Sequence, residues 1–220
     1  MAVLTVSRQF GAGGKTLADR IAQRLGYTVA TEAIIEQLAE SARISPKGIS
    51  DLDTEQGWSC PPASGIMAAG RFIERLLHPQ QTFMDGQVYL QLLREIVPKI
   101  AERGNTVIVG RGAQFILRGF YDTYHVLLVA KAPDRIRFMI DHYDLLLPEA
   151  KRIVRRQDRR RQRLMQLLYQ DDYDRPWNYD LVLNMSKLTM QSAAAMVCRM
   201  VAEPAEAMEL GIADAAAQPA

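Results

Sequence analysis

The sequence is poor in the residue types that build a disulfide scaffold, a metal site or a membrane span. Of its 220 residues only two are cysteine, Cys60 and Cys198, and only three are histidine. Two cysteines so far apart exclude a cysteine-based zinc site and a disulfide framework, and they are typical of a reducing compartment. No apolar run approaches the roughly 18 residues of a membrane span. The start of the chain, with Arg8 close behind the first residues, is too short for a signal peptide. We therefore expect a cytoplasmic protein without a membrane partner.

An excess of charge of one sign is also missing overall, yet basic residues are concentrated in one place. The chain has 27 basic and 25 acidic residues and a net charge of +2. Residues 151–163 (KRIVRRQDRRRQR), which we call the basic strip, hold eight basic residues and one acidic residue. Such a run is either a solvated helix face or part of an anion site.

Short apolar segments alternate with helical patterns along the chain. Several of these segments are largely apolar rather than alternating, as in parallel strands that are covered on both faces. They are residues 2–7, 27–30, 106–109, 124–130 and 181–184. Helical patterns cover residues 83–103, 148–169 (possibly broken) and 189–203, and another begins at Pro133. The sequence predicts an α/β fold with a five-stranded parallel sheet flanked by helices. We expect one domain over residues 1–204, with a helical insertion at about 31–103 and a flexible tail at 205–220.

A glycine cluster follows the first apolar segment. Residues 11–16 read GAGGKT and stand between a predicted strand and a helical pattern. Glycines let backbone N–H groups turn inward around phosphate oxygens, and the start of a helix adds partial positive charge. The alternative is a tight turn that binds nothing. We predict that nucleotide phosphates bind Arg8, Gly11, Ala12, Gly13, Gly14, Lys15 and Thr16. The hydroxyl of Thr16 would ligate Mg²⁺.

The lysine of this loop is displaced from its usual place. The common pattern GxxxxGK[ST] requires glycine where this chain has Gln9, and the pattern GxxGxGKGT has its lysine where this chain has Gly14. Two explanations stay open: a small bulge restores Lys15 to the phosphates, or another cation, first of all Arg8, replaces it. The dinucleotide-binding pattern GxGxxG fits less well, because Thr16 stands at its third glycine.

Arg111 stands just behind another predicted strand. It lies between Gly110 and Gly112, directly after the apolar segment TVIV. The carboxyl ends of parallel strands are where α/β sheets bind ligands, and a guanidinium can clamp a phosphate with two parallel hydrogen bonds. We predict that Gly110 and Arg111 bind a phosphate. A salt bridge to a helix carboxylate is the alternative.

Three segments in this order resemble the cytidylate kinase-like family of P-loop kinases. They are residues 7–14 (SRQFGAGG), 107–113 (VIVGRGA) and 179–184 (YDLVLN), and together they span most of the chain. The resemblance implies a P-loop NTPase fold with an insertion that binds a nucleoside monophosphate and an arginine-rich lid at about residues 133–176. It also implies ATP-dependent phosphorylation of a nucleoside monophosphate, CMP or dCMP above all, with Mg²⁺ as cofactor.

The resemblance places the basic strip in the lid. Lids of these kinases supply arginines that stabilise charge on the transferring phosphoryl group. The lid pattern Asp-x-x-Arg matches Asp158 and Arg161, so Asp158 is expected either to orient Arg161 or to contact the acceptor. The residues predicted to be catalytic are Lys15, Arg156, Arg160 and Arg161. A solvated helix face remains the alternative for several arginines of the strip.

The acceptor side departs from the family pattern. Gly112 stands where the family motif Gly-Arg-Asp has aspartate, and residues 29–32 (VATE) stand where members often have Tyr-Asp-(Lys/Arg)-Glu. In the motif Gly-Arg-Asp the arginine binds the acceptor phosphate, so the resemblance implies this role for Gly110 and Arg111. Arg71 of the insertion is a further candidate. No acidic residue ends the segment 106–109. Mg²⁺ would therefore be coordinated by Thr16, ATP and water.

The sequence therefore predicts a nucleoside-monophosphate kinase that acts on ATP as a monomer or homodimer. Two other functions stay open: a P-loop kinase for a different small acceptor, and a nucleotide-binding regulatory protein with little catalysis. A nucleic-acid partner is disfavoured, because the basic strip contains no aromatic residue for base stacking.

Overall fold

A computed structural model describes residues 2–31, 35, 86–169 and 173–203. Their strands form one parallel sheet in the order β2-β3-β1-β4-β5. The strands are β1 (Val3–Arg8), β2 (Thr28–Ala30), β3 (Thr106–Val109), β4 (Thr123–Val129) and β5 (Leu181–Asn184). The predicted five-stranded parallel sheet is confirmed, and each predicted strand agrees with the structure to within one residue at either end. The glycine cluster follows the central strand.

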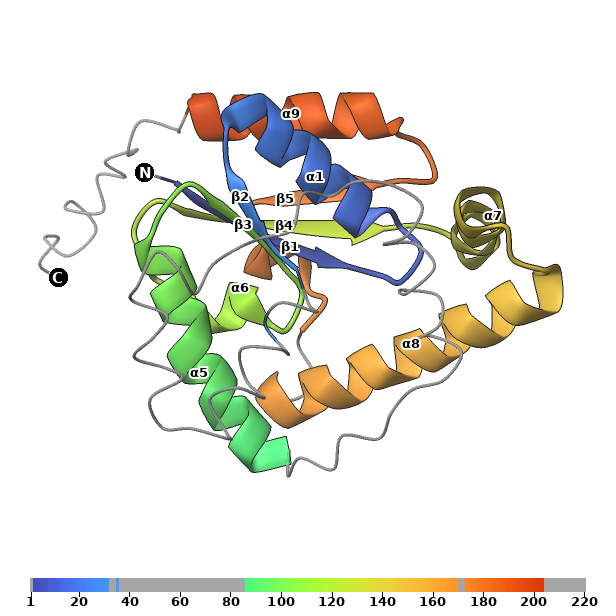
Figure 1. The fold of residues 1–220 in the computed structure, drawn as a ribbon, viewed down its shortest axis with the longest axis horizontal. Helices are drawn as coiled ribbons and strands as arrows, with labels where there is room; N and C mark the ends of the chain where they lie inside the picture. Colours follow the sequence, from blue (N-terminus) through green and yellow to red (C-terminus); the bar gives the residue numbers. More distant parts are fainter. Residues whose placement is uncertain (1, 32–34, 36–85, 170–172, 204–220) are drawn as a thin grey trace, which may run out of the picture.

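Helices cover both faces of the sheet (Figure 1). α1 (Gly14–Leu25) and α9 (Met190–Ala202) pack on one face, whereas α5 (Gly86–Glu102) and α6 (Ala113–Ile116) pack on the other. Side chains alternate along a strand. Leu4 and Val6 of β1 therefore join the core under α1 and α9, and Val3 joins the core under α5.

A helix pair extends beyond the sheet. α7 (Ala132–Tyr143) follows β4, and α8 (Leu147–Tyr169) runs back from it toward α5 (Figure 1). The pair has a small core of its own around Met139, Ile153 and Val154, against which Phe10 of the glycine loop packs. α8 is one continuous helix, so the break considered for residues 148–169 does not occur within the described residues. The segment predicted to be a lid is therefore a helical pair that packs against the glycine loop through Phe10.

Some elements were not predicted, and some predictions lie outside the described residues. The sequence analysis missed α6 and a short 3₁₀ helix at Pro176–Asn178, because both are too short for a helical pattern to be visible. Arg71 and most of the insertion belong to residues 36–85, which lie outside the described part of the chain.

A polar pair, buried Thr5 and half-buried His125, lies between β1 and β4. Thr5 and His125 are partners in the strand register, and Thr5 Oγ1 lies 2.8 Å from His125 Nδ1. Burial lowers the pKa of His125, more than the nearby Asp180 raises it. The folded protein therefore favours the neutral imidazole.

We expect this pair to make stability depend on pH. Because the folded-state pKa of His125 is below the unfolded value of about 6.5, its contribution is fully present above that pH and is lost as pH falls toward the folded pKa. The midpoint of thermal unfolding, measured from pH 5 to pH 8, should therefore fall less steeply toward acid pH in His125→Gln than in the wild type.

His142→Gln is the matched control, because His142 is exposed on α7. It should keep the acid slope of the wild type. An unchanged slope in His125→Gln would contradict the assignment.

Candidate active site

The loop between β1 and α1 is anchored at the carboxyl end of the central strand. The Gln9 N–H donates to the Leu128 carbonyl at 3.0 Å, and Gln9 Oε1 accepts from the Ala130 N–H at 2.9 Å. Gly11 and Gly13 have φ values of 83° and 82°, in the left-handed region that favours glycine. Gly13 is the N-cap of α1, and no side chain caps this helix. The N–H groups of the first turn can therefore bind an anion, as in phosphate-binding loops.

The two cations predicted for this loop are placed differently. Lys15 is the second residue of α1, and its exposed ammonium lies 3.2 Å from Asp19 Oδ2, one turn further along the helix. Because α1 begins at Gly14 directly after the N-cap Gly13, the bulge considered for Lys15 is absent. Arg8 is the last residue of β1 and is half-buried beside the loop. Arg8 therefore lies against the start of α1, whereas the Lys15 side chain lies at the outer surface of that helix.

Arg111 lies two residues after the end of the neighbouring strand β3, in an uncommon backbone conformation. Gly110, Arg111 and Gly112 have φ values of 80°, 58° and 70°. A residue other than glycine in this region costs on the order of 1 kcal/mol, and such conformations cluster at functional sites. The Arg111 side chain is only 5% exposed. Gly112 is the N-cap of α6, so its left-handed backbone accounts for glycine where the family motif has aspartate.

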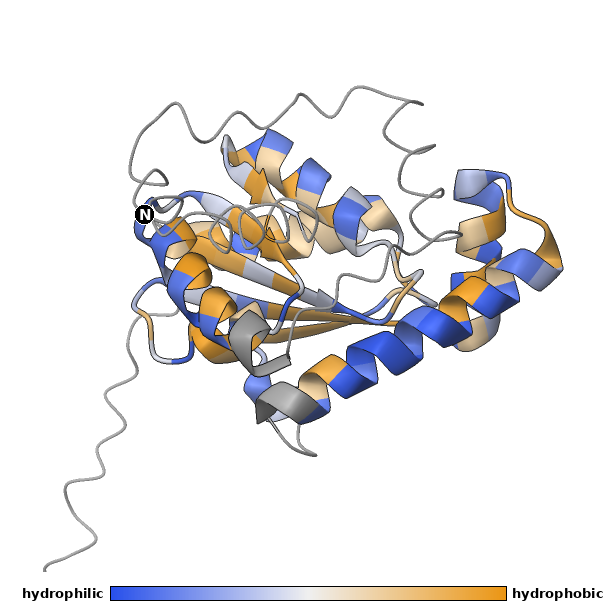
Figure 2. Ribbon diagram, turned by 60° about the horizontal axis from the view of Figure 1, so that its bottom comes forward, coloured by the Kyte–Doolittle hydropathy of each residue, from blue (hydrophilic) through white to orange (hydrophobic). Residues whose placement is uncertain are grey.

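Arg161 connects the basic strip to the sheet. Its Nη2 donates to Ser7 Oγ at 3.2 Å, and its guanidinium forms two hydrogen bonds with Asp174, at 2.8 Å and 2.5 Å. Burial lowers the pKa of Arg161, but the ion pair with Asp174 outweighs it and raises the pKa overall. The arginine therefore stays charged beside the last residues of β1. Figure 2 shows the middle of α8 as an almost continuous hydrophilic band.

Buried polar side chains surround Ser7, the residue that Arg161 contacts. Ser7, Gln114 and Tyr179 are each less than a tenth exposed. The Tyr179 hydroxyl donates to the Tyr173 carbonyl at 2.9 Å, accepts from Gln114 Nε2 at 3.2 Å and lies 3.5 Å from Ser7 Oγ. Burial raises the pKa of Tyr179, so its hydroxyl stays protonated. We call Ser7, Gln114 and Tyr179 the Ser7 cluster. Ser7 and Tyr179 each begin a segment that resembles the family, whereas no motif pointed to Gln114.

The first role expected for Asp158, orienting Arg161, is wrong. Its carboxylate accepts two hydrogen bonds from Arg135 Nη1, at 2.8 Å and 2.9 Å. The same guanidinium donates to the carbonyls of Phe10 at 3.0 Å and Ala130 at 3.1 Å. Arg135 is 7% exposed. Asp158 and Arg161 point to different partners, and Asp158 joins α8 to the glycine loop through Arg135.

The other predicted arginines of the strip differ in exposure. Arg156 is half-buried, and its Nη2 is buried without a hydrogen-bond partner among the described residues. A buried donor left unpaired costs about 1–3 kcal/mol, and a phosphate oxygen would satisfy it. Arg160 is exposed. The structure thus brings Arg156 and Arg161 toward the protein and leaves Arg160 at the surface.

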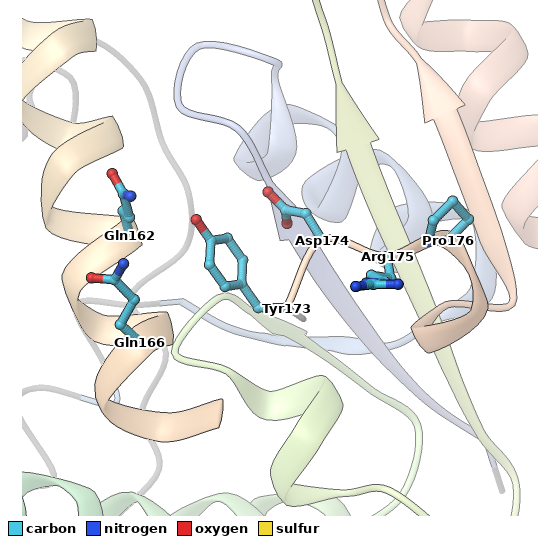
Figure 3. Close-up of a pocket in the computed structure, with 6 residues that line it drawn as sticks. All are labelled: Gln162, Gln166, Tyr173, Asp174, Arg175 and Pro176. Atoms are coloured by element: carbon cyan, nitrogen blue, oxygen red, sulfur yellow. The ribbon is translucent and has the colours of Figure 1, made fainter. Parts of the chain in front are cut away.

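A pocket of about 480 Å³ opens beside Arg161. Its walls are Gln162 and Gln166 of α8 and the segment of Tyr173, Asp174, Arg175 and Pro176. Figure 3 shows the two amide side chains projecting from the helix toward Tyr173. No motif pointed to this pocket, because its walls come from two separate segments. It offers amide and carboxylate hydrogen-bonding groups next to the basic strip.

This fold and site define the class of the protein. A parallel sheet with a glycine loop behind its central strand and a basic helix over the same edge is the architecture of P-loop kinases. A solved structure of an uncharacterized protein from Eubacterium ventriosum matches with a TM-score of 0.63 at 15% identity, covering 92% of this chain and 98% of the other. A gluconokinase from Sinorhizobium meliloti matches with a TM-score of 0.50 at 13% identity, covering 92% of each chain.

The chain belongs to the cytidylate kinase-like family, whose model matches residues 3–187. It is thus a kinase-type phosphotransferase with a nucleotide-binding P-loop. No curated protein matches the sequence. Across the residues that the structure describes, no helix is long and apolar enough to cross a bilayer.

We expect Arg135 to hold the helix pair and the loop together. Arg135→Met keeps the carbon stem but leaves the Asp158 carboxylate and two carbonyl oxygens without their donor. The free energy of unfolding should fall by about 2 kcal/mol or more, measured by chemical denaturation. Arg137→Met, an exposed position on the same helix, should change it by less than about 0.5 kcal/mol. Equal effects of the two substitutions would contradict this role.

Proposed function

We propose that the chain transfers the γ-phosphoryl group of ATP to a nucleoside monophosphate, with CMP or dCMP as the preferred acceptor. The glycine loop, Gly11 to Thr16, would bind the ATP phosphates through the first N–H groups of α1. Arg111 and Gly110 at the end of β3 would bind the acceptor phosphate. α7 and α8 would form the lid, with Arg156, Arg160 and Arg161 near the transferring group.

The observation that carries this proposal is the contact between Arg161 and Ser7. It places a charged arginine of the basic strip against the end of β1, one residue before Arg8 and the glycine loop. Membership in the cytidylate kinase-like family supports kinase-type transfer as the chemistry of the proposed site. In a basic strip that merely faced solvent, no arginine side chain would be largely covered and in contact with the central strand, as that of Arg161 is.

Mg²⁺ would be held by few protein groups. Among the described residues, no three acidic, histidine or cysteine side chains stand together in a way that could hold a metal ion. The hydroxyl of Thr16, in the first turn of α1, is a hard oxygen ligand that fits Mg²⁺, which commonly keeps phosphate oxygens and waters as its other ligands. These ligands fit a Mg²⁺ ion that binds together with the nucleotide. When bound, the ion would neutralise phosphate charge.

The transfer requires positioning and charge rather than a strong base. An oxygen of the acceptor phosphate forms a bond to the γ-phosphorus while the bond to the bridging oxygen of ADP breaks. The products are ADP and a nucleoside diphosphate. Guanidinium groups on both sides stabilise the charge that spreads over the transferring oxygens, and the bound geometry supplies the proximity. Asp158 would act through Arg135 by holding α8 near the loop.

A panel of acceptors tests the proposed reaction. ADP release from ATP and Mg²⁺ should be fastest with CMP or dCMP, compared with UMP, AMP, GMP, gluconate and other small hydroxy acceptors. Preference for a non-nucleotide would establish the other kinase function, which the glycine at position 112 favours because it removes the aspartate of the family motif. ATP binding without transfer to any acceptor would instead favour a regulatory protein.

Arg111→Ala should impair acceptor use far more than ATP binding. Loss of one charged donor typically lowers the rate about 10²–10³-fold, and we expect this loss in kcat/KM for the acceptor. Arg199→Ala, at an exposed position of α9 that pairs with Glu203, is the matched control and should behave as wild type. Near-normal acceptor kinetics in Arg111→Ala would remove Arg111 from the acceptor site.

A further inference from the structure

Arg8 ends the central strand on the face that α1 covers. Side chains alternate along β1, and Leu4 and Val6 belong to the core cluster under α1 and α9. Arg8 continues this series. Its side chain therefore extends toward the first turn of α1, away from the Ser7 cluster on the opposite face.

Two glycines shape the space around the Arg8 side chain. A Cβ atom at Gly14 would lie 2.8 Å from Arg8 Cγ and 3.1 Å from Arg8 Cδ. A Cβ atom at Gly110 would overlap Arg8 Nη1. The Gly110 N–H donates to the Val6 carbonyl at 3.1 Å, so this glycine adjoins the end of β1. The arginine passes the first residue of α1, and its guanidinium ends at the carboxyl end of β3.

The space that Arg8 fills is where the usual phosphate-loop lysine begins. In the pattern GxxGxGKGT, the lysine falls where this chain has Gly14. Here Gly13 is the N-cap and Gly14 is the first residue of α1. The lysine position thus carries no side chain, and the stem of Arg8 lies in its place.

We propose that Arg8 is the cation that binds the β- and γ-phosphates of ATP, in place of a lysine at the first helical position. This rests on the proposed function, which puts the ATP phosphates on the glycine loop. A guanidinium is always charged and offers two parallel donors to a phosphate. Arginine at 8 and glycine at 14 and 110 form one matched set, in which the cation extends from the sheet rather than from the helix.

Lys15 is the competing cation, and it is engaged elsewhere. Its side chain is half exposed and pairs with Asp19 at 3.2 Å along the outer surface of α1. An exposed pair of this kind contributes little to stability. Substitution of Arg8 is therefore expected to weaken ATP binding more than substitution of Lys15, although both residues lie at the same loop.

Calorimetric titration with ATP and with AMP isolates the phosphate contact. Arg8→Gln keeps a stem beside Gly14 and removes the charge. It should weaken ATP binding about tenfold to hundredfold, because charge-assisted hydrogen bonds are lost. AMP, which lacks the β- and γ-phosphates, should lose much less. Arg20→Ala, an exposed arginine of α1, is the matched control and should bind both nucleotides as wild type.

Moving the positive charge from position 8 to position 14 gives a second, stricter test. Arg8→Ala combined with Gly14→Lys should recover ATP affinity relative to Arg8→Ala alone. Gly14→Ala should lower the midpoint of thermal unfolding in the wild type but not in the Arg8→Ala background, where the crowding Cγ is gone. Thermal unfolding of each variant also shows whether it is folded.

The outcomes separate this assignment from the proposed function. Unchanged ATP affinity in Arg8→Gln, or a larger loss in Lys15→Ala than in Arg8→Gln, overturns the role of Arg8 while ATP-dependent transfer stands. A wild-type chain that binds no ATP overturns both.

Discussion

The site depends on one buried guanidinium. Arg135 of α7 donates to the carbonyls of Phe10 and Ala130 and to the carboxylate of Asp158. It thereby connects the glycine loop, the end of β4 and the basic helix α8. A charged group that is 7% exposed needs such partners, because a buried charge without them is costly. Its partners hold the loop and α8 in a fixed relation, and the rest of the site is built on that relation.

The side chains on the two faces of β1 contact different parts of the site. Ser7 points to the side of α6, where the Ser7 cluster receives Arg161 from α8. Arg8 points to the side of α1 and lies along Gly14. Because consecutive residues of a strand point to opposite faces, one dipeptide brings two arginines from different elements to the same end of the central strand. Positive charge is thus concentrated where the polyphosphate of a nucleotide would lie.

Sequence reasoning predicted the parts of this site that depend on local order. Five apolar segments predicted the strands, and the glycines of residues 11–16 predicted a loop that begins a helix. It could not predict that Asp158 would pair with Arg135 rather than orient Arg161, since that choice depends on how α7 and α8 pack. The spacing of Asp158 and Arg161 suggested one shared face, but each side chain finds its partner on a different element. The pairing of Arg8 with Gly14 and Gly110 likewise arises only when three separate segments meet.

The central claim is that the phosphates of ATP lie on the glycine loop with the Arg8 guanidinium against them. A crystal structure with Mg²⁺, a non-hydrolysable ATP analogue and CMP tests this most directly. The account predicts Arg8 nitrogens at hydrogen-bond distance, about 2.7–2.9 Å, from β- or γ-phosphate oxygens, with Lys15 still at the surface. Lys15 on the phosphates and Arg8 turned away from them would contradict it.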